Sequence, residues 1–284
     1  MPRVISLINL KGGVGKTTLT VALGEFFSLW HGLKVLIIDT DPQTNATVAL
    51  MSEKEWKRRN VKGQTLLGIF KDEVDKYQVF SPQEAIVKKV SNIGGGIDNL
   101  HLLPSSLDLI EFQEEFLYRR HDYEHVFRPS LLKERLEEVL HCYDLVLIDC
   151  PPDLGFITRN ALYMSDYYLI PVIPDILSTY GIPQIINRVE KLKKKTGIGL
   201  EPLGIVVSKF RVQSNVHKSQ LRLLRAQAGQ GGYRRVFDTV IPENNQSAAV
   251  MDFNHSFAGL EDKYGYKRPY EEYKALAEEV LAYV

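Results

Sequence analysis

Residues 10–18 read Leu-Lys-Gly-Gly-Val-Gly-Lys-Thr-Thr, a glycine-rich turn between the apolar run 4–8 and a helical pattern over 16–31. The glycines give the backbone access to conformations closed to residues with a Cβ, so successive N–H groups can converge on phosphate oxygens. The N-terminus of the following helix adds the positive end of its dipole. Lys16 is placed to reach the β- and γ-phosphates, and the Thr17 hydroxyl to bind Mg²⁺. The turn therefore predicts a site for a nucleoside triphosphate with its Mg²⁺ ion.

The turn departs from the usual phosphate-binding sequence, G-x-x-x-x-G-K-[ST], at two positions. Leu10 replaces the first glycine, and Lys11 adds a second lysine. The form x-K-G-G-x-G-K-[ST] resembles the deviant Walker A motif of the ParA/MinD family. In that family the extra lysine reaches the nucleotide of a partner subunit, and the resemblance implies the same role for Lys11. A turn with two solvated lysines is the alternative, but it leaves the flanking strand and helix unexplained.

Two further segments place carboxylates at the ends of apolar strands. Residues 37–47, Ile-Ile-Asp-Thr-Asp-Pro-Gln-Thr-Asn-Ala-Thr, resemble switch I of ParA-type ATPases, in which the second aspartate, here Asp41, positions the attacking water. An aspartate followed by proline is also a common turn. Residues 145–149, Leu-Val-Leu-Ile-Asp, have the form of a Walker B strand, which predicts that Asp149 holds the hydration shell of Mg²⁺. The continuation to residue 162 resembles the family's switch II, with Asp153 where a serine is often found.

The resemblance covers most of the chain and implies a full set of site residues. Residues 168–174 are similar to the strand and loop after switch II, and residues 240–249 resemble the I-P-x-N segment on the adenine side. The residues implied to contact nucleotide are Lys11, Gly12, Gly13, Val14, Gly15, Lys16, Thr17, Thr18, Pro242 and Asn244. The implied catalytic residues are Lys11, Lys16 and Asp41, and the implied metal ligands are Thr17, Asp41 and Asp149.

Short β-branched runs alternate with longer helical patterns along the chain. Such near-continuous apolar strands predict an α/β fold of three layers, a mostly parallel twisted sheet flanked by helices, as in P-loop NTPases. We expect one ATPase domain over 1–284. The predicted strands are 4–8, 34–39, 100–103, 145–149, 168–172, 203–208 and 236–241, and the predicted helices include 16–31, 131–141, 183–195, 216–228 and 270–283. Residues 51–64 and 255–268 are polar, lack clear periodicity and are predicted to be surface excursions of undisclosed role.

Composition limits the functional classes. Lys and Arg number 35 and Asp and Glu number 35, so the net charge of zero gives no global indication of a nucleic-acid partner. Cys142 and Cys150 are too few for a disulfide framework and are not spaced as a metal site, which suits a reducing cytosol. No stretch approaches the roughly 20 apolar residues that span a bilayer, and the run after Met1 is too short for a signal peptide. We therefore expect a cytoplasmic protein without stable membrane insertion.

Positive charge is nevertheless concentrated in one region. Residues 188–235 contain 12 Lys or Arg against 2 acids, a local net charge of +10 that leaves −10 for the rest. Within the predicted helix 216–228 the basic residues form a stripe beside Leu221 and Leu224, which are expected to face the core. A solvated basic face explains the stripe as simply as a DNA surface does. The predicted DNA-binding residues are Lys218, Arg222, Arg225, Arg234 and Arg235.

The family resemblance converts these features into a functional hypothesis. It implies an ATPase that hydrolyses ATP to ADP and phosphate, forms an ATP-dependent sandwich homodimer and binds DNA without sequence preference. A ParB-like or other cargo-linked activator would stimulate hydrolysis, and the cargo would be a plasmid, a chromosome region or a protein assembly on the nucleoid. The first predicted strand begins a few residues from the start of the chain, so we expect no N-terminal helix-turn-helix for operator binding.

Two other classes are weighed against this hypothesis. A MinD-like membrane-associated regulator of the cell-division site would expose a C-terminal amphipathic anchor, whereas residues 270–284 are predicted to form an acidic helix that anionic lipid repels. Electron transfer like that of the nitrogenase iron protein needs a pair of cluster cysteines from each subunit. Neither Cys142 nor Cys150 lies in the matching motif context, so the ParA-like hypothesis ranks first.

Overall fold

A seven-stranded parallel sheet forms the centre of the molecule. The computed structural model describes residues 1–76, 79–118, 128–230, 232–243, 250–266 and 268–284. The strands lie in the order β3-β2-β4-β1-β5-β6-β7, and each neighbouring pair is parallel. Their bounds are β1 (Arg3–Leu7), β2 (Val35–Asp39), β3 (Leu100–Leu103), β4 (Leu145–Asp149), β5 (Tyr167–Val172), β6 (Glu201–Phe210) and β7 (Val236–Pro242). All seven predicted strands are present, which confirms the predicted fold class.

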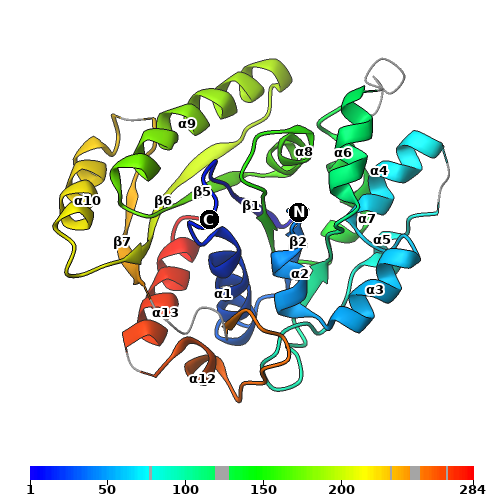
Figure 1. Ribbon diagram of the computed structural model, residues 1–284, viewed down its shortest axis with the longest axis horizontal. Helices are drawn as coiled ribbons and strands as arrows, with labels where there is room; N and C mark the ends of the chain where they lie inside the picture. The colour runs from blue at the N-terminus through cyan, green and yellow to red at the C-terminus, as the bar shows by residue number, and fades with distance from the viewer. Residues whose placement is uncertain (77–78, 119–127, 231, 244–249, 267) are drawn as a thin grey trace.

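Helices cover both faces of this sheet and make the three layers visible in Figure 1. One face carries α1 (Lys16–Leu29), α2 (Asn45–Leu50), α3 (Glu53–Val61), α12 (Leu260–Tyr264) and α13 (Arg268–Leu281). The other carries α4 (Leu66–Asp75), α5 (Pro82–Ala85), α6 (Leu109–Tyr118), α7 (Leu131–Leu140), α8 (Phe156–Met164), α9 (Ile176–Thr196) and α10 (Asn215–Gln227). Successive strand residues pack on opposite faces, Val4 in one core and Ile5 in the other. Burial on both faces explains why the strands are apolar almost throughout.

The sheet brings the predicted site segments to one edge. Asp39 ends β2 and Asp149 ends β4, and the two residues are register partners. Leu7, the last residue of β1, is the partner of Asp149 on its other side. The glycine-rich turn leaves β1 at this edge and enters α1. Because ligands bind open α/β sheets outside the carboxyl ends of their strands, this edge is the expected place for a nucleotide.

Residues 51–64 are not the irregular excursion that the sequence analysis predicts. They include α3, whose N-cap Ser52 accepts a hydrogen bond from Glu55 N at 3.3 Å. Ion pairs from Glu53 to Lys57 and from Glu55 to Arg59 span one helical turn on its exposed side. Trp56 is the one buried residue of α3, and it holds the helix to the body of the protein. Its Nε1 donates a hydrogen bond to Ser105 O at 2.9 Å. One buried residue is too few to give a visible helical period.

Residues 255–268 also differ from the predicted surface excursion. Phe257, Leu260, Lys263 and Tyr264 from this segment are all buried, and α12 packs with α1 and α13 in one core. The segment looks polar in sequence because its most deeply buried member is a lysine, whose charge is neutralised inside the protein by Glu25 of α1. A polar composition therefore concealed a core segment.

The helix α9 begins two turns before its predicted start at residue 183. Pro183 lies inside the helix rather than at its first turn. The N-cap is Asp175, whose Oδ1 accepts a hydrogen bond from Ser178 N at 2.6 Å. The capping aspartate, eight residues before the proline, sets the boundary.

Candidate nucleotide site

The glycine-rich turn adopts the backbone conformation that its sequence requires. Gly13 and Gly15 have φ values of 75° and 85°, in the left-handed region that favours glycine. Gly15 is also the residue that precedes the first turn of α1. Ser208, near the end of β6, donates its hydroxyl hydrogen to Val14 O at 2.6 Å and ties the turn to the sheet. The first N–H groups of α1 are thus held open toward the end of the strands.

The turn borders a cleft of about 370 Å³. Five parts of the chain meet there: the turn with the start of α1, the segment after β2, the loop after β4, the end of β6 and the segment after β7. The lining residues are Gly12, Gly13, Gly15, Lys16, Thr17, Thr18, Asp41, Gln43, Asn45, Val48, Pro152, Lys209 and Met251. Most of the predicted phosphate and metal residues therefore lie around one hollow.

The two lysines of the turn lie in different surroundings. Lys16 is almost fully buried in the cleft wall, where its Nζ lies 3.3 Å from Asn9 O and 3.4 Å from Lys11 O. Lys11 is not among the cleft-lining residues. Its Nζ lies 3.1 Å from Asp175 Oδ2 and 2.9 Å from Ser178 Oγ, at the start of α9. Although both lysines are predicted nucleotide residues, the ammonium group of Lys11 points away from the cleft of its own chain.

Two buried carboxylates face each other at the bottom of the site. Asp39 accepts hydrogen bonds from Thr47 N and Oγ1 at 2.8 and 2.7 Å. Asp149 Oδ1 accepts one from Thr20 Oγ1 at 3.3 Å, but its Oδ2 is buried without a hydrogen-bond partner. Burial, with a smaller contribution from the charge of Asp41, raises the pKa of Asp149 to about 7. Burial and the charge of Asp149 raise the pKa of Asp39 as well.

The donor set fits a hydrated magnesium ion. An unpartnered carboxylate oxygen beside a second carboxylate is costly unless a cation or ordered water satisfies it. Thr17, which lines the cleft and lies close to the Asp149 side chain, offers a hydroxyl oxygen at the same place. Carboxylate and hydroxyl oxygens with water are the ligands that Mg²⁺ prefers. Asp39 is a further carboxylate of this site that the predicted ligand set did not include.

Asp41 is a third carboxylate of the site and lines the cleft itself. Its Oδ1 accepts a hydrogen bond from Gln43 N at 2.9 Å, a local turn that fixes the side chain. Burial raises the pKa of Asp41, and the hydrogen bond from Gln43 and the charge of Lys16 oppose that rise. This carboxylate borders the same cleft as the Lys16 ammonium group.

Several cleft residues were not found from the sequence. These are Gln43, Asn45, Val48, Pro152, Lys209 and Met251. Lys209 follows Ser208 on β6 and has a φ of 50°, an uncommon value for a residue with a side chain. Gln43 and Asn45 lie in the segment that resembles switch I, and Pro152 in the one that resembles switch II, but neither resemblance assigned them a role. Val48, Lys209 and Met251 belong to no motif, so the sequence held no signal for them.

Of the two predicted adenine-side residues, one lies at a different hollow and the other is outside the residues that the structure describes. Pro242 ends β7 as the register partner of Phe210 and lines a separate hollow with Arg225 and Glu271. Asn244 falls in 244–249, outside the described residues. Pro242 is not among the residues that line the cleft.

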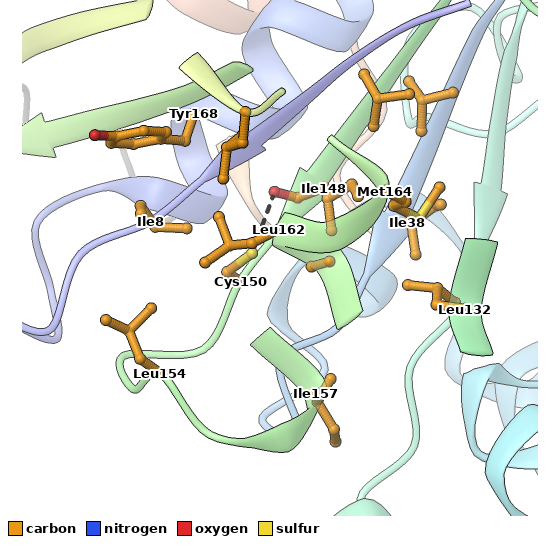
Figure 2. Packing of buried hydrophobic residues seen from close by; sticks show 14 of the residues in the cluster. Ile8, Ile38, Leu132, Ile148, Cys150, Leu154, Ile157, Leu162, Met164 and Tyr168 are labelled. Atoms are coloured by element: carbon orange, nitrogen blue, oxygen red, sulfur yellow. Dashed lines mark hydrogen bonds between the residues drawn. The ribbon is translucent and has the colours of Figure 1, made fainter. Parts of the chain in front are cut away.

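Cys150 is a packing residue next to the site. It is fully buried and lies among Ile8, Ile148 and Leu162 of the apolar core (Figure 2). Burial raises the pKa of its thiol to about 12, so the reactive thiolate is suppressed. Cys142 is exposed.

The predicted DNA residues divide into two groups. Lys218 and Arg222 are exposed on α10, while Leu224 is buried and Leu221 half-buried beneath them, as the helical stripe predicts. Three other basic residues already have partners within the chain. Arg225 donates to Asp238 O at 3.1 Å, Arg234 pairs with Glu201 at 2.8 Å, and Arg235 stacks on the Tyr283 ring at 3.4 Å.

Comparisons with known proteins decide the family. The AAA domain family matches residues 2–201. The chain is 31% identical over 283 residues to the chromosome-partitioning ATPase Soj of Thermus thermophilus, an alignment that covers 99% of this chain and 96% of that protein. It is 32% identical over 244 residues to the sporulation initiation inhibitor protein Soj of Bacillus subtilis, covering 86% and 85% of the two chains. The chain belongs to the ParA/Soj family of partition ATPases. This confirms the family predicted from the deviant Walker A motif.

Solved structures agree with this ParA-type fold. A putative plasmid partition protein from Borrelia burgdorferi, solved with AMPPNP, superposes with a TM-score of 0.76 at 24% identity, and each chain is covered in full. At that identity the likeness establishes the fold.

The C-terminal helix of this ParA-family chain is packed against the body of the protein. Leu276, Ala277 and Val280 of α13 are buried in the core that α1 also lines. Glu279 accepts hydrogen bonds from the N–H groups of Asp238 and Thr239 on β7 at 2.7 and 3.0 Å. The apolar face of α13 is thus occupied, which argues against this helix as a membrane anchor. None of the helices described is both long and apolar enough to span a bilayer.

Proposed function

We propose that residues 1–284 act as one ATPase domain that binds ATP with Mg²⁺, dimerises around the nucleotide and binds DNA without sequence preference. A partner protein attached to a cargo then stimulates hydrolysis to ADP and phosphate and releases the dimer. The cargo would be a plasmid, a chromosome region or a protein assembly, positioned over the nucleoid in the cytoplasm.

The separation of the two lysines is the observation that carries this proposal. Lys16 lies in the cleft wall, where an ammonium group can neutralise the β- and γ-phosphates. Lys11 faces outward, 41% exposed and paired with Asp175. A partly exposed lysine in the same turn can reach the phosphates of a nucleotide that is bound to a second chain, docked against this surface. Dimerisation would exchange the Asp175 carboxylate for the partner's phosphate, an anion of higher charge.

The remaining roles follow from the geometry of the cleft. The N–H groups of the turn and of the first turn of α1 would hold the phosphates. Thr17, Asp149 and Asp39 would surround Mg²⁺ and its waters, and the ion would neutralise charge on the phosphates when bound. Asp41 would orient the attacking water in the cleft. Catalysis in this scheme is positioning and electrostatic stabilisation, which agrees with a slow basal rate before a partner completes the site.

The test is gel filtration of the full chain with ADP, ATP and a non-hydrolysable ATP analogue. We expect dimers with ATP and with the analogue, and single chains with ADP. Lys11→Ala should lose that dimer and retain most of its ATP affinity, because the substitution removes only the group offered to the neighbour. Asp175→Ala serves as the matched control, since it breaks the same ion pair and leaves Lys11 in place. A Lys11→Ala protein that dimerises normally would contradict the proposed interface.

DNA retention is measured on the same fractions. Reversing Arg222 and Arg225 to Glu should weaken duplex binding by about tenfold or more and lower the salt dependence by about two counterions, with ATP binding unchanged. Lys57→Glu with Lys62→Glu, on and beside the distant α3, gives the same change in charge as a control. Undiminished DNA retention in the Arg222 and Arg225 variant would return the stripe to a solvated basic face.

A further inference from the structure

A second hollow, of about 290 Å³, lies between α8 and α9. We call it the α8–α9 groove. None of its lining residues lines the nucleotide cleft, and none belongs to the predicted DNA set. Three leucines, Leu154, Leu162 and Leu192, form an apolar floor, and four basic residues, Arg159, Arg188, Lys191 and Lys195, form its rim. We propose that this groove docks an acidic amphipathic segment of a partner protein.

The floor is made of side chains already held by the core. Leu162 on α8 is buried and Leu154, in the loop after β4, is nearly so. Both pack around Cys150 in the larger apolar cluster (Figure 2). Leu192 on α9 is half-buried beside them. The recess is therefore a preformed apolar surface that an incoming apolar side chain can cover without rearrangement of the fold.

The rim is arranged by helical spacing. Arg188, Lys191 and Lys195 are three and seven residues apart, which places them on one face of α9. Arg159 approaches from α8, with its Nε donating to Leu154 O at 3.2 Å. All four side chains belong to exposed residues.

The rim cations have no carboxylate partner within the part of the chain that the structure describes. No acidic residue lines the groove. By contrast, Lys193, one turn away on the same helix, pairs with Glu190 at 3.2 Å and Glu201 at 3.5 Å. Four cations without a carboxylate partner among the described residues thus line one recess, a pattern that attracts an anionic partner.

The apolar floor favours a protein over DNA as that partner. A duplex presents a rigid row of phosphates and has no apolar group that would fill a recess lined by leucine. An amphipathic helix with leucine or phenylalanine on one face and glutamate on its flanks meets both demands, because its apolar residues cover the floor and its carboxylates reach the rim.

The groove is also connected to the nucleotide site through the chain. Leu154 and Arg159 follow Asp149 by five and ten residues, so one wall of the groove continues the segment that carries the metal-site aspartate. An occupant would hold this wall against α9. Identifying the occupant as the hydrolysis-stimulating partner rests on the proposed function, whereas the docking chemistry does not.

The experiment titrates the full chain into a fluorescein-labelled helical peptide that carries leucine on one face and glutamate on both flanks. Saturable binding is expected, weakened about tenfold or more when the leucines are replaced by serine and likewise when the glutamates are replaced by glutamine. These peptide-side changes test the floor and the rim without any risk to the folding of the protein.

The protein-side variant is Arg188→Glu with Lys191→Glu. It should weaken peptide binding by about tenfold or more, since two attractive contacts become repulsive. The matched control, Lys194→Glu with Lys54→Glu, makes the same change in charge on α9 and α3 outside the groove and should change binding by less than about twofold. ATP binding to each variant, followed with a fluorescent nucleotide, reports whether the cleft is intact.

Three outcomes would overturn the docking site: no saturable binding of the glutamate-leucine peptide, equal binding of its serine version, or a rim variant that loses duplex DNA and keeps the peptide. If the unmodified chain bound the peptide but did not bind ATP, or did not dimerise with ATP, the proposed function alone would be refuted. The two failures are therefore distinguishable.

Discussion

Helix α1 carries a polar cluster at each end, and the two clusters differ in one respect. At its N-terminus, Lys16 and Thr17 face the nucleotide cleft, where Asp149 Oδ2 is buried without a partner. Nearer its C-terminus, eight residues after Thr17, Glu25 is buried in a network that satisfies both of its oxygens. The first cluster awaits a ligand, and the second is complete.

The complete cluster is built from three distant parts of the chain. Glu25 accepts hydrogen bonds from Lys263 Nζ at 2.7 Å, Ser91 Oγ at 2.5 Å and Tyr264 OH at 2.6 Å. Lys263 also donates to Asn92 Oδ1 at 2.7 Å. The Glu25 and Lys263 side chains have no exposed surface. The comparison teaches that burial of charge alone does not mark a functional site, whereas a buried polar atom without a partner does.

The largest expected effect is on the complete cluster. Lys263→Met leaves the Glu25 carboxylate buried and uncompensated, so the free energy of unfolding should fall by about 3–5 kcal/mol in urea denaturation. Lys57→Met, which removes an exposed lysine also paired with a glutamate, should cost less than about 1 kcal/mol. If Lys263→Met lowered the free energy of unfolding as little as Lys57→Met does, the network would not be what holds residues 255–266 against the core.

The next effect is at the ligand end of α1. Lys16→Ala removes a cation from phosphate contact and should weaken ATP binding by about 100-fold, while the free energy of unfolding of the nucleotide-free chain changes by about 1 kcal/mol or less. Isothermal titration calorimetry with MgATP measures the first quantity and urea denaturation the second. Undiminished ATP affinity would remove Lys16 from the site.

The smallest expected effect is a gain in stability, opposite in sign to the loss expected for Lys263→Met. Burial raises the pKa of Asp149 to about 7, well above that of an unfolded aspartate, so above pH 7 the ionised side chain opposes folding and below it the penalty fades. Asp149→Asn should therefore stabilise the nucleotide-free chain by about 1 kcal/mol at pH 8, with a smaller gain at pH 6. Thermal unfolding at the two pH values checks this. Destabilisation at pH 8 would mean that the aspartate serves the fold.

The sequence predicted the cluster at the N-terminus of α1 better than the Glu25 cluster, for a physical reason. Phosphate binding demands glycine at fixed turn positions and a lysine and a hydroxyl at fixed distances after them, so residues 10–18 form a legible motif. The strands could be predicted equally well, because burial on both faces of the sheet makes them apolar almost throughout. Asp149 was found because it ends such a strand, and Asp41 because it follows one by two residues.

Other features depended on contacts between distant segments. Lys263 reads as a solvated lysine until Glu25, 238 residues away, is placed beside it. The pairing of Lys11 with Asp175 and the basic rim across α8 and α9 likewise exist only in the folded chain. Lys209 joins the cleft through the position of β6 rather than through a motif.

The central claim is that Lys11 serves the nucleotide of a neighbouring chain. A crystal structure of Asp41→Ala, which should bind ATP and hydrolyse it poorly, tests this most directly. The account predicts two chains face to face, with Lys11 released from Asp175 and its Nζ at about 3 Å from the γ-phosphate of the partner's nucleotide. ATP-bound single chains in which Lys11 still pairs with Asp175 would contradict it.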